Sequence, residues 1–66
     1  MIRGDVVVLR ADKIYADYGK PVTYYLVLEE HENDLITIHN PITHDTIATF
    51  RRDLVLVSKS VNEKNF

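Results

Sequence analysis

Apolar residues recur at every second position on both sides of an Asn40-Pro41 pair, and this pattern predicts a β-hairpin. Residues 35–39 read Leu-Ile-Thr-Ile-His, and residues 47–50 read Ile-Ala-Thr-Phe. A period of two is typical of strands that bury one face. Proline fixes its own φ and disfavours helix at the residue before it, so Asn40-Pro41 is expected to start the turn, which extends over residues 40–45.

Two further strands are predicted on the N-terminal side of the hairpin. Residues 5–10 contain the run Val-Val-Val-Leu, which is typical of a buried strand. The longest strand is expected from Pro21, because a missing N–H is tolerated at a first strand position. Both of its faces are apolar, and a bend would turn Tyr25 or Val27 inward at one end. We assign to the core the alternating set Val22, Tyr24, Leu26 and Leu28.

Three connections complete the predicted order of elements. Residues 11–20 follow neither a strand nor a helix period and are expected to form a structured loop. Residues 29–34 form a dense acidic connection, in which Asn33-Asp34 supplies the turn. Residues 51–53 are too few for a stable helix, so we expect a single 3₁₀ turn that leads into a last strand at residues 54–57.

Length and composition limit the class of protein. A chain of 66 residues makes one domain, which we expect over residues 1–58, with a polar tail at residues 59–66. No Cys is present, so neither a disulfide nor a thiolate zinc site supports the fold. No apolar run approaches the ~20 residues of a membrane span, so a soluble, cytoplasmic protein without a membrane partner is expected. The formal net charge of -2 argues against nonspecific binding to a polyanion.

The predicted order of strand, long loop, strand, acidic turn, strand, short turn, strand, 3₁₀ corner and strand resembles the SH3-like small β-barrel. Residues 11–20 stand where that fold has its long first loop, residues 40–45 at its distal hairpin and residues 51–53 at its 3₁₀ corner. Residues 3–10, Arg-Gly-Asp-Val-Val-Val-Leu-Arg, are similar to the start of KOW-type domains. The resemblance implies an all-β, five-stranded barrel filled by its own side chains, so function is expected on the outer face or the loops.

Tyrosines and the acidic turn form the predicted partner-binding site. Tyr offers a large contact area at low entropic cost and a polar tip, which suits a protein interface or the cation cage of Tudor-type barrels. A small chain also needs aromatic rings for packing, so Tyr24 is expected in the core and Tyr15 and Tyr18 on the surface. Acidic side chains either steer a basic partner or simply keep the turn soluble. The predicted partner-binding residues are Tyr15, Tyr18, Tyr25, Glu29, Glu30, Glu32 and Asp34.

The alternative function is binding of RNA or DNA in the manner of KOW-type domains. Basic side chains would contact phosphates, and the affinity would fall steeply with salt. The residues that would serve this function are Arg3, Arg10, Arg51, Arg52 and Lys59.

The sequence carries no catalytic or metal-binding motif. His31, His39 and His44 fit no ligand spacing and are expected to be solvated turn residues, so neither a metal nor a cofactor is predicted. There is no Cys nucleophile, and the carboxylates cluster where water screens them. We therefore expect a noncatalytic binding module and not an enzyme: a small accessory or regulatory protein, of the kind that phages encode, with a protein partner.

Overall fold

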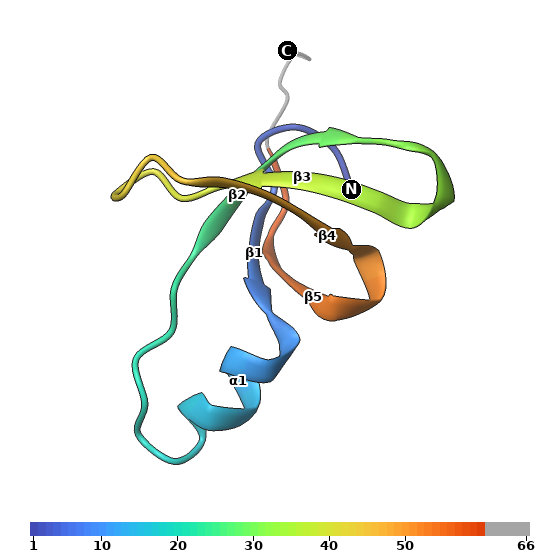
Figure 1. Cartoon of the computed structure of the whole chain (residues 1–66). Helices are drawn as coiled ribbons and strands as arrows, with labels where there is room; N and C mark the ends of the chain where they lie inside the picture. The colour runs from blue at the N-terminus through green and yellow to red at the C-terminus, as the bar shows by residue number, and fades with distance from the viewer. Residues whose placement is uncertain (61–66) are drawn as a thin grey trace, which may run out of the picture.

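The alternating segments of the sequence form strands, and these strands build one antiparallel sheet (Figure 1). The computed structural model describes residues 1–60; residues 61–66, which belong to the predicted polar tail, lie outside the described residues. The order in the sheet is β4-β3-β2-β1-β5. The strands are β1 (Val6–Leu9), β2 (Tyr25–Glu30), β3 (Leu35–His39), β4 (Thr46–Phe50) and β5 (Leu54–Ser58).

The prediction was an all-β fold with five strands, and the structure is mostly β, with five antiparallel strands in one sheet. The predicted 3₁₀ turn is also present, as η2 (Arg51–Asp53), and it leads directly into β5. The sheet is not closed, because β4 and β5 are its two edges. Register shifts in β1 and in β2 bend these strands, and Figure 1 shows β3 and β4 running across the direction of β1 and β5.

The core lies where the inner faces of the strands meet. Val27 faces Ile38 across the β2–β3 pair, and both side chains are fully buried. Residues that face each other across an antiparallel pair lie on the same side of the sheet, so these two side chains pack together. The buried cluster of the described chain consists of Val7, Val27, Ile36, Ile38 and Leu54.

The core face predicted for β2 is wrong. Regular pairing begins at Tyr25, so an alternation counted from Val22 starts outside the strand. Tyr25 faces Val7 and packs against the core, whereas Tyr24 is 55% exposed. The sequence analysis also considered a bend that turns Tyr25 or Val27 inward, and in the structure both of these side chains face the core. The predicted core residues are partly buried or exposed instead: Val22, Tyr24, Leu26 and Leu28.

The predicted loop at residues 11–20 is also wrong, because it begins with a short helix, α1 (Arg10–Ala16). Asp12 lies in the first turn, where a negative charge complements the helix dipole. A helix of 7 residues is unstable alone, so the contacts of α1 with β1, β5 and η2 stabilise it. Gly19, with a φ of 82°, adopts the left-handed conformation that follows many helix ends. Within residues 1–60, no helix has the length and apolar character needed to cross a bilayer.

Both predicted turns are present. Between β2 and β3, in η1 (Glu32–Asp34), Asn33 and Asp34 have φ values of 62° and 61°, as a tight hairpin turn requires. Between β3 and β4, Asn40 Oδ1 accepts hydrogen bonds from the backbone N–H groups two and three residues later. Asn40 is buried, so these contacts satisfy an amide that water does not reach.

Candidate functional site

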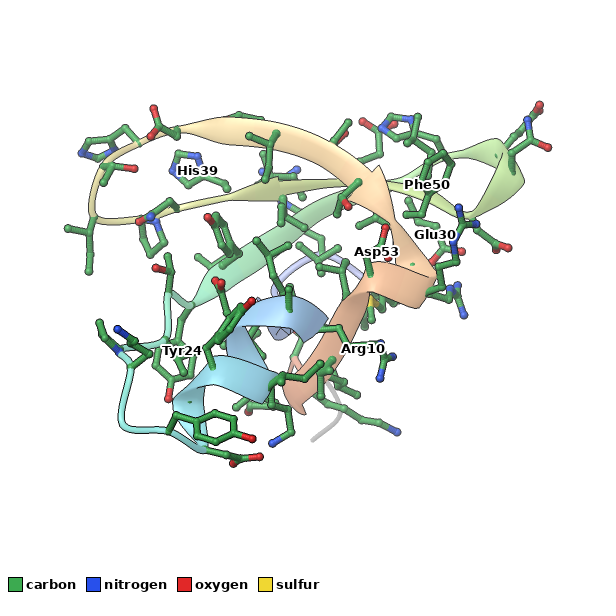
Figure 2. All side chains as sticks on the ribbon, turned by 60° about the horizontal axis from the view of Figure 1, so that its bottom comes forward. Arg10, Tyr24, Glu30, His39, Phe50 and Asp53 are labelled. Atoms are coloured by element: carbon green, nitrogen blue, oxygen red, sulfur yellow. The ribbon has the colours of Figure 1, made fainter. Side chains whose placement is uncertain are left out.

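A groove of about 340 Å³ lies beside α1, and we call it the α1 groove. Figure 2 shows Tyr24 beside α1, with its ring at the side of the helix. Val8 of β1 and Val55 of β5 face each other in the strand pair and line the groove. Two charged residues, Lys13 and Asp17, line the groove. The apolar residues that define the α1 groove are Val8, Ala16, Val22, Tyr24, Val55, Leu56 and Val57.

The groove exists because α1 covers the outer face of β1 and β5 only in part. Val8 points away from the core that contains Val7, since successive strand residues face opposite sides. Val8 is nevertheless buried, because α1 packs on β1 at this place. Tyr24 and Val57 remain exposed, so the groove is open to solvent along these residues.

Arg10 fixes the start of α1 on the last strand. Its Nε atom donates a hydrogen bond to the carbonyl oxygen of Arg52 (2.8 Å), and its Nη2 atom donates one to the carbonyl oxygen of Leu54 (3.2 Å). Both acceptors lie at the junction of η2 and β5. A guanidinium has five N–H donors in a rigid fork, which suits this double contact. The side chain therefore holds the helix, and with it one wall of the α1 groove, in place.

The two tyrosines predicted on the surface are exposed there. Tyr15 lies in α1 and Tyr18 follows it, and the Tyr18 N–H bonds to the Tyr15 carbonyl oxygen at 2.9 Å. Exposed Ile14 and Tyr24 lie on and beside the same helix. Tyr24 thus takes the surface place predicted for Tyr25, which packs against the core. We call Tyr15, Tyr18 and Tyr24 the tyrosine surface.

The predicted acidic connection is exposed, but only its second half is a turn, because Glu29 and Glu30 are the last two residues of β2. Glu29, Glu30, Glu32 and His31 line an almost flat depression there. The His31 Nε2 atom lies 2.7 Å from the Thr37 hydroxyl, and its Nδ1 atom lies 3.9 Å from a carboxylate oxygen of Glu29. The ring is therefore held by side chains of β2 and β3, and the turn presents carboxylates to solvent.

Glu30 differs from the other carboxylates of the acidic connection because a positively charged group binds each of its two oxygens. The Met1 ammonium group donates a hydrogen bond to its Oε1 atom at 3.0 Å. Arg51 forms a salt bridge with its Oε2 atom. The hydrogen bonds from the ammonium group and from Arg51 lower the pKa of Glu30 below its ordinary value. Glu30 thus connects β2 with η2 and is less available to a partner than its neighbours.

The structure does not bring the tyrosines and the acidic residues into one site. Tyr24 directly precedes β2, and Glu30 is the last residue of that strand. A strand rises by about 3.3 Å per residue, so these two residues are about 20 Å apart along the strand. Figure 1 shows α1 and the β2–β3 turn at different corners of the molecule. They are therefore two separate surface features.

Most of the predicted nucleic-acid-binding residues have partners within the chain. Arg10 bonds to the backbone at the start of β5, and Arg51 pairs with Glu30. The Arg52 guanidinium carbon lies 4.7 Å from the centroid of the Phe50 ring, at the distance of a cation–π contact. The other two basic residues of the set are exposed: Arg3 and Lys59. The chain thus uses much of this basic set to support its own fold.

The histidines lie at strand ends and turns. The rings of His39 and His44 approach each other across the β3–β4 turn, with centroids 6.0 Å apart. His39 Nδ1 lies 3.1 Å from the hydroxyl of Thr46, which faces it in the strand register. In the part of the chain that the structure describes, no three His, Cys, Asp or Glu side chains gather so that they could hold a metal ion.

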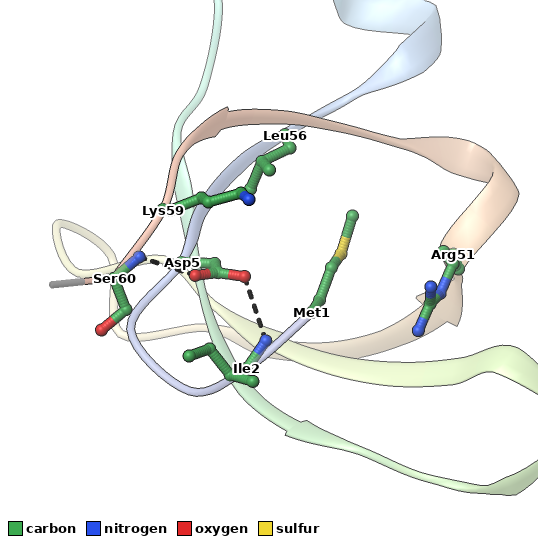
Figure 3. A pocket seen from close by; sticks show the side chains of 7 residues that line it. All are labelled: Met1, Ile2, Asp5, Arg51, Leu56, Lys59 and Ser60. Atoms are coloured by element: carbon green, nitrogen blue, oxygen red, sulfur yellow. Dashed lines mark hydrogen bonds between the residues drawn. The ribbon is translucent and has the colours of Figure 1, made fainter. Parts of the chain in front are cut away.

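Sequence reasoning missed a buried carboxylate. Asp5 is 4% exposed, and its Oδ2 and Oδ1 atoms accept hydrogen bonds from the N–H groups of Ile2 (3.0 Å) and Ser60 (2.7 Å) (Figure 3). Burial alone would raise the pKa of Asp5, but the hydrogen bonds from Ser60 and Ile2 outweigh it, and the pKa is lowered. A cavity of about 440 Å³ lies beside this group and is also lined by Lys59. Both carboxylate oxygens of Asp5 thus accept hydrogen bonds. The side chain connects the segment before β1, which contains Ile2, with the segment after β5, which contains Ser60.

Comparison with known proteins assigns the chain to no family. No family model, no curated protein sequence and no solved structure matches it.

Proposed function

We propose that this chain is a small noncatalytic binding module whose partner is a protein that docks on the tyrosine surface and in the α1 groove. The observation that carries the proposal is that Tyr15, Tyr18 and Tyr24 are exposed on or close to the segment of α1, and that Tyr24 also lines a largely apolar groove. Single exposed apolar residues are ordinary, whereas such a gathering is typical of interaction sites. Tyrosine is also enriched among the residues that dominate binding energy in protein interfaces.

The acidic turn has a secondary part in this proposal. Glu29, Glu32 and Asp34 are exposed and carry one sign of charge. Such a cluster attracts a basic partner and raises its rate of association, more than it contributes to the final affinity. The acidic residues lie about 20 Å from the tyrosine surface along β2. This distance exceeds the Debye length of about 8 Å at physiological salt, so added salt weakens the attraction.

We also propose that the fold is a small barrel of the SH3-like kind. The strand order β4-β3-β2-β1-β5, the β3–β4 hairpin and the 3₁₀ turn before β5 support this interpretation. In that fold the segment between the first two strands is a long loop, and here this segment holds α1, Tyr15 and Tyr18. Because one fold serves many functions, the binding proposal rests on these side chains and not on the fold.

Replacing Tyr15 and Tyr18 together by alanine is expected to abolish capture of the protein partner, because the two rings supply much of the exposed contact area. Both side chains are exposed, so the melting temperature should change by less than about 3 °C. Affinity capture from native lysate, with identification by mass spectrometry, measures the first effect. Thermal unfolding followed by circular dichroism measures the second.

Ile42→Ala is the matched control for the tyrosine variant. Ile42 lies in the β3–β4 turn and is 86% exposed, so its removal deletes apolar surface without touching α1. Capture should persist in this variant. Equal loss of capture in both variants contradicts the proposed site, and a large fall in the melting temperature of the tyrosine variant would assign its rings to packing.

The alternative, binding of RNA or DNA, gives a different result in the same experiment. The exposed basic residues Arg3 and Lys59 would carry it, and each phosphate contact would add about 0.9 to the slope of log affinity against log salt. We expect no retention of nucleic acid at physiological salt. Retention that disappears with added salt but survives in the tyrosine variant would favour this alternative over the protein partner.

A further inference from the structure

β4 is a sheet edge that lacks protective features. Within the described residues it pairs with β3 alone, the pairing is regular along the whole strand, and 4 of its 5 residues are exposed. Natural edge strands are usually protected by Lys, Pro, an inward charge or a bulge. The β4 sequence Thr-Ile-Ala-Thr-Phe contains none of these. The edge is therefore able to accept another strand.

The backbone of β4 determines which groups this edge offers. The Asn40 N–H donates to the Asp45 carbonyl oxygen at 2.8 Å, so residue 45 turns its carbonyl group toward β3. Backbone direction alternates along an antiparallel strand, so Ile47 and Thr49 also turn toward β3. The free N–H and C=O groups at the edge consequently belong to Thr46, Ala48 and Phe50.

We propose that β4 pairs with the β4 strand of a second copy of this chain, antiparallel and about a two-fold axis at Ala48. In this register Ala48 faces Ala48, and Thr46 faces Phe50 on either side of the axis. Every outward backbone group of the strand then finds a partner. In a register shifted by one residue, the backbone groups that point out from one β4 strand would face residues of the other strand whose backbone groups point toward β3. A shift by two residues would leave one end of each strand unpaired.

The side chains are self-complementary in the same register. Ala48 is small, so the two copies meet at the axis without a clash. Just outside the paired strands, Asp45 of one copy lies across from Arg51 of the other, so a negative charge meets a positive one at both ends of the interface. Arg51 already pairs with Glu30, but a guanidinium has enough donors to bind a second carboxylate.

A second copy fits this edge better than an unrelated peptide does. An isologous contact needs a surface that is complementary to itself, and the sequence from residue 45 to residue 51 has opposite charges at its ends and a small residue at its centre. Two-fold pairing also uses up the β4 edge in both copies, so the assembly closes as a dimer. None of the β4 residues lines the α1 groove, so the tyrosine surface stays free.

The test uses two substitutions at the axis, Ala48→Lys and Ala48→Glu, in the full chain. The Ala48 side chain is exposed, so neither change should disturb the monomer. Like charges directly opposite each other are unfavourable, so each variant alone should self-associate at least about fivefold more weakly than the wild type. An equimolar mixture of the two variants should recover the affinity, because only the proposed register places residue 48 opposite residue 48. Sedimentation velocity over a range of concentrations measures the association of the 7.7 kDa chain.

Ser58→Lys is the control, because it places the same charge on the other edge strand, β5, at an exposed residue that does not line the α1 groove. This variant should associate like the wild type. The proposal is overturned by a wild-type chain that stays monomeric at millimolar concentration, by a mixture that associates no better than the single variants, or by an effect of Ser58→Lys alone, which would assign the contact to β5. Binding of an unrelated peptide to β4 without self-association would overturn it as well.

Discussion

Replacing Ile38 by alanine is expected to lower the free energy of unfolding by about 2–5 kcal/mol. Ile38 is fully buried in β3, between Val27 on β2 and Ile47 on β4. The paired strands on both sides prevent the cavity from collapsing, so the loss includes packing contacts as well as transfer from water. The whole domain is expected to be stable by only about 3–10 kcal/mol, so the variant should be close to unfolding. Urea denaturation followed by circular dichroism measures the change.

Leu26→Ala is the matched control for the core assignment. Leu26 lies on the opposite face of β2 from Val27 and is half-buried, so its loss should cost less than about 2 kcal/mol. A cost for Leu26 equal to that for Ile38 would contradict the assignment of the inner face. A cost near zero for Ile38 would contradict the position of the core itself.

Replacing Asp5 by alanine is expected to lower the free energy of unfolding by about 2–4 kcal/mol at neutral pH. The substitution leaves the N–H groups of Ile2 and Ser60 without their acceptor. It also separates the segment before β1 from the segment after β5, which this carboxylate connects (Figure 3). Urea denaturation at pH 7 measures the loss, and a cost below about 0.5 kcal/mol would show that water replaces the carboxylate.

The free energy of unfolding is expected to depend on pH because of the Asp5 carboxylate. The pKa of Asp5 is lowered from 3.8 in the folded chain, so its contribution is complete above that value and is lost as the pH falls through the lower, folded value. The wild type should therefore lose stability below about pH 4, and Asp5→Asn should flatten this dependence. Glu30, whose pKa is also lowered, adds a dependence of the same sign that remains in the variant.

Asp17→Asn is the control for the acid titration. Asp17 is exposed, so this variant removes the same negative charge as Asp5→Asn without changing the buried contacts of Asp5 with Ile2 and Ser60. If Asp5→Asn and Asp17→Asn lose stability in parallel with the wild type as the pH falls, then Asp5 is not the group responsible.

The sequence predicts the strands best where only one face is apolar. In β3, Ile36 and Ile38 alternate with polar residues, and the structure buries both isoleucines. In β2 both faces are apolar, so the pattern does not show which face is buried. The prediction placed Tyr24 in the core and Tyr25 on the surface, and the structure has the opposite arrangement. The turns were predictable because Asn33-Asp34 and Asn40 satisfy local backbone requirements.

What the sequence did not reveal depends on contacts between distant segments. α1 is too short to be stable alone, and Arg10 holds it through carbonyl oxygens at the start of β5. The α1 groove likewise needs Val8 and Val55, which only the pairing of β1 with β5 brings together. The exposure of Tyr15 and Tyr18 was predictable, because it follows from their place in a polar segment. Asp5 was missed because one of its donors, Ser60, lies at the far end of the described chain.

β1 comes before the other four strands of the sheet in the sequence, yet its place is inside the sheet, between β2 and β5. During synthesis on the ribosome, one edge of β1 therefore stays without its partner strand until residues 54–58 have emerged. Closing so large a loop is slow compared with forming the local hairpins. The domain consequently completes its fold only after the last strand is available, and a nascent chain that stalls before that point exposes Val7 and Leu9 as a target for chaperones.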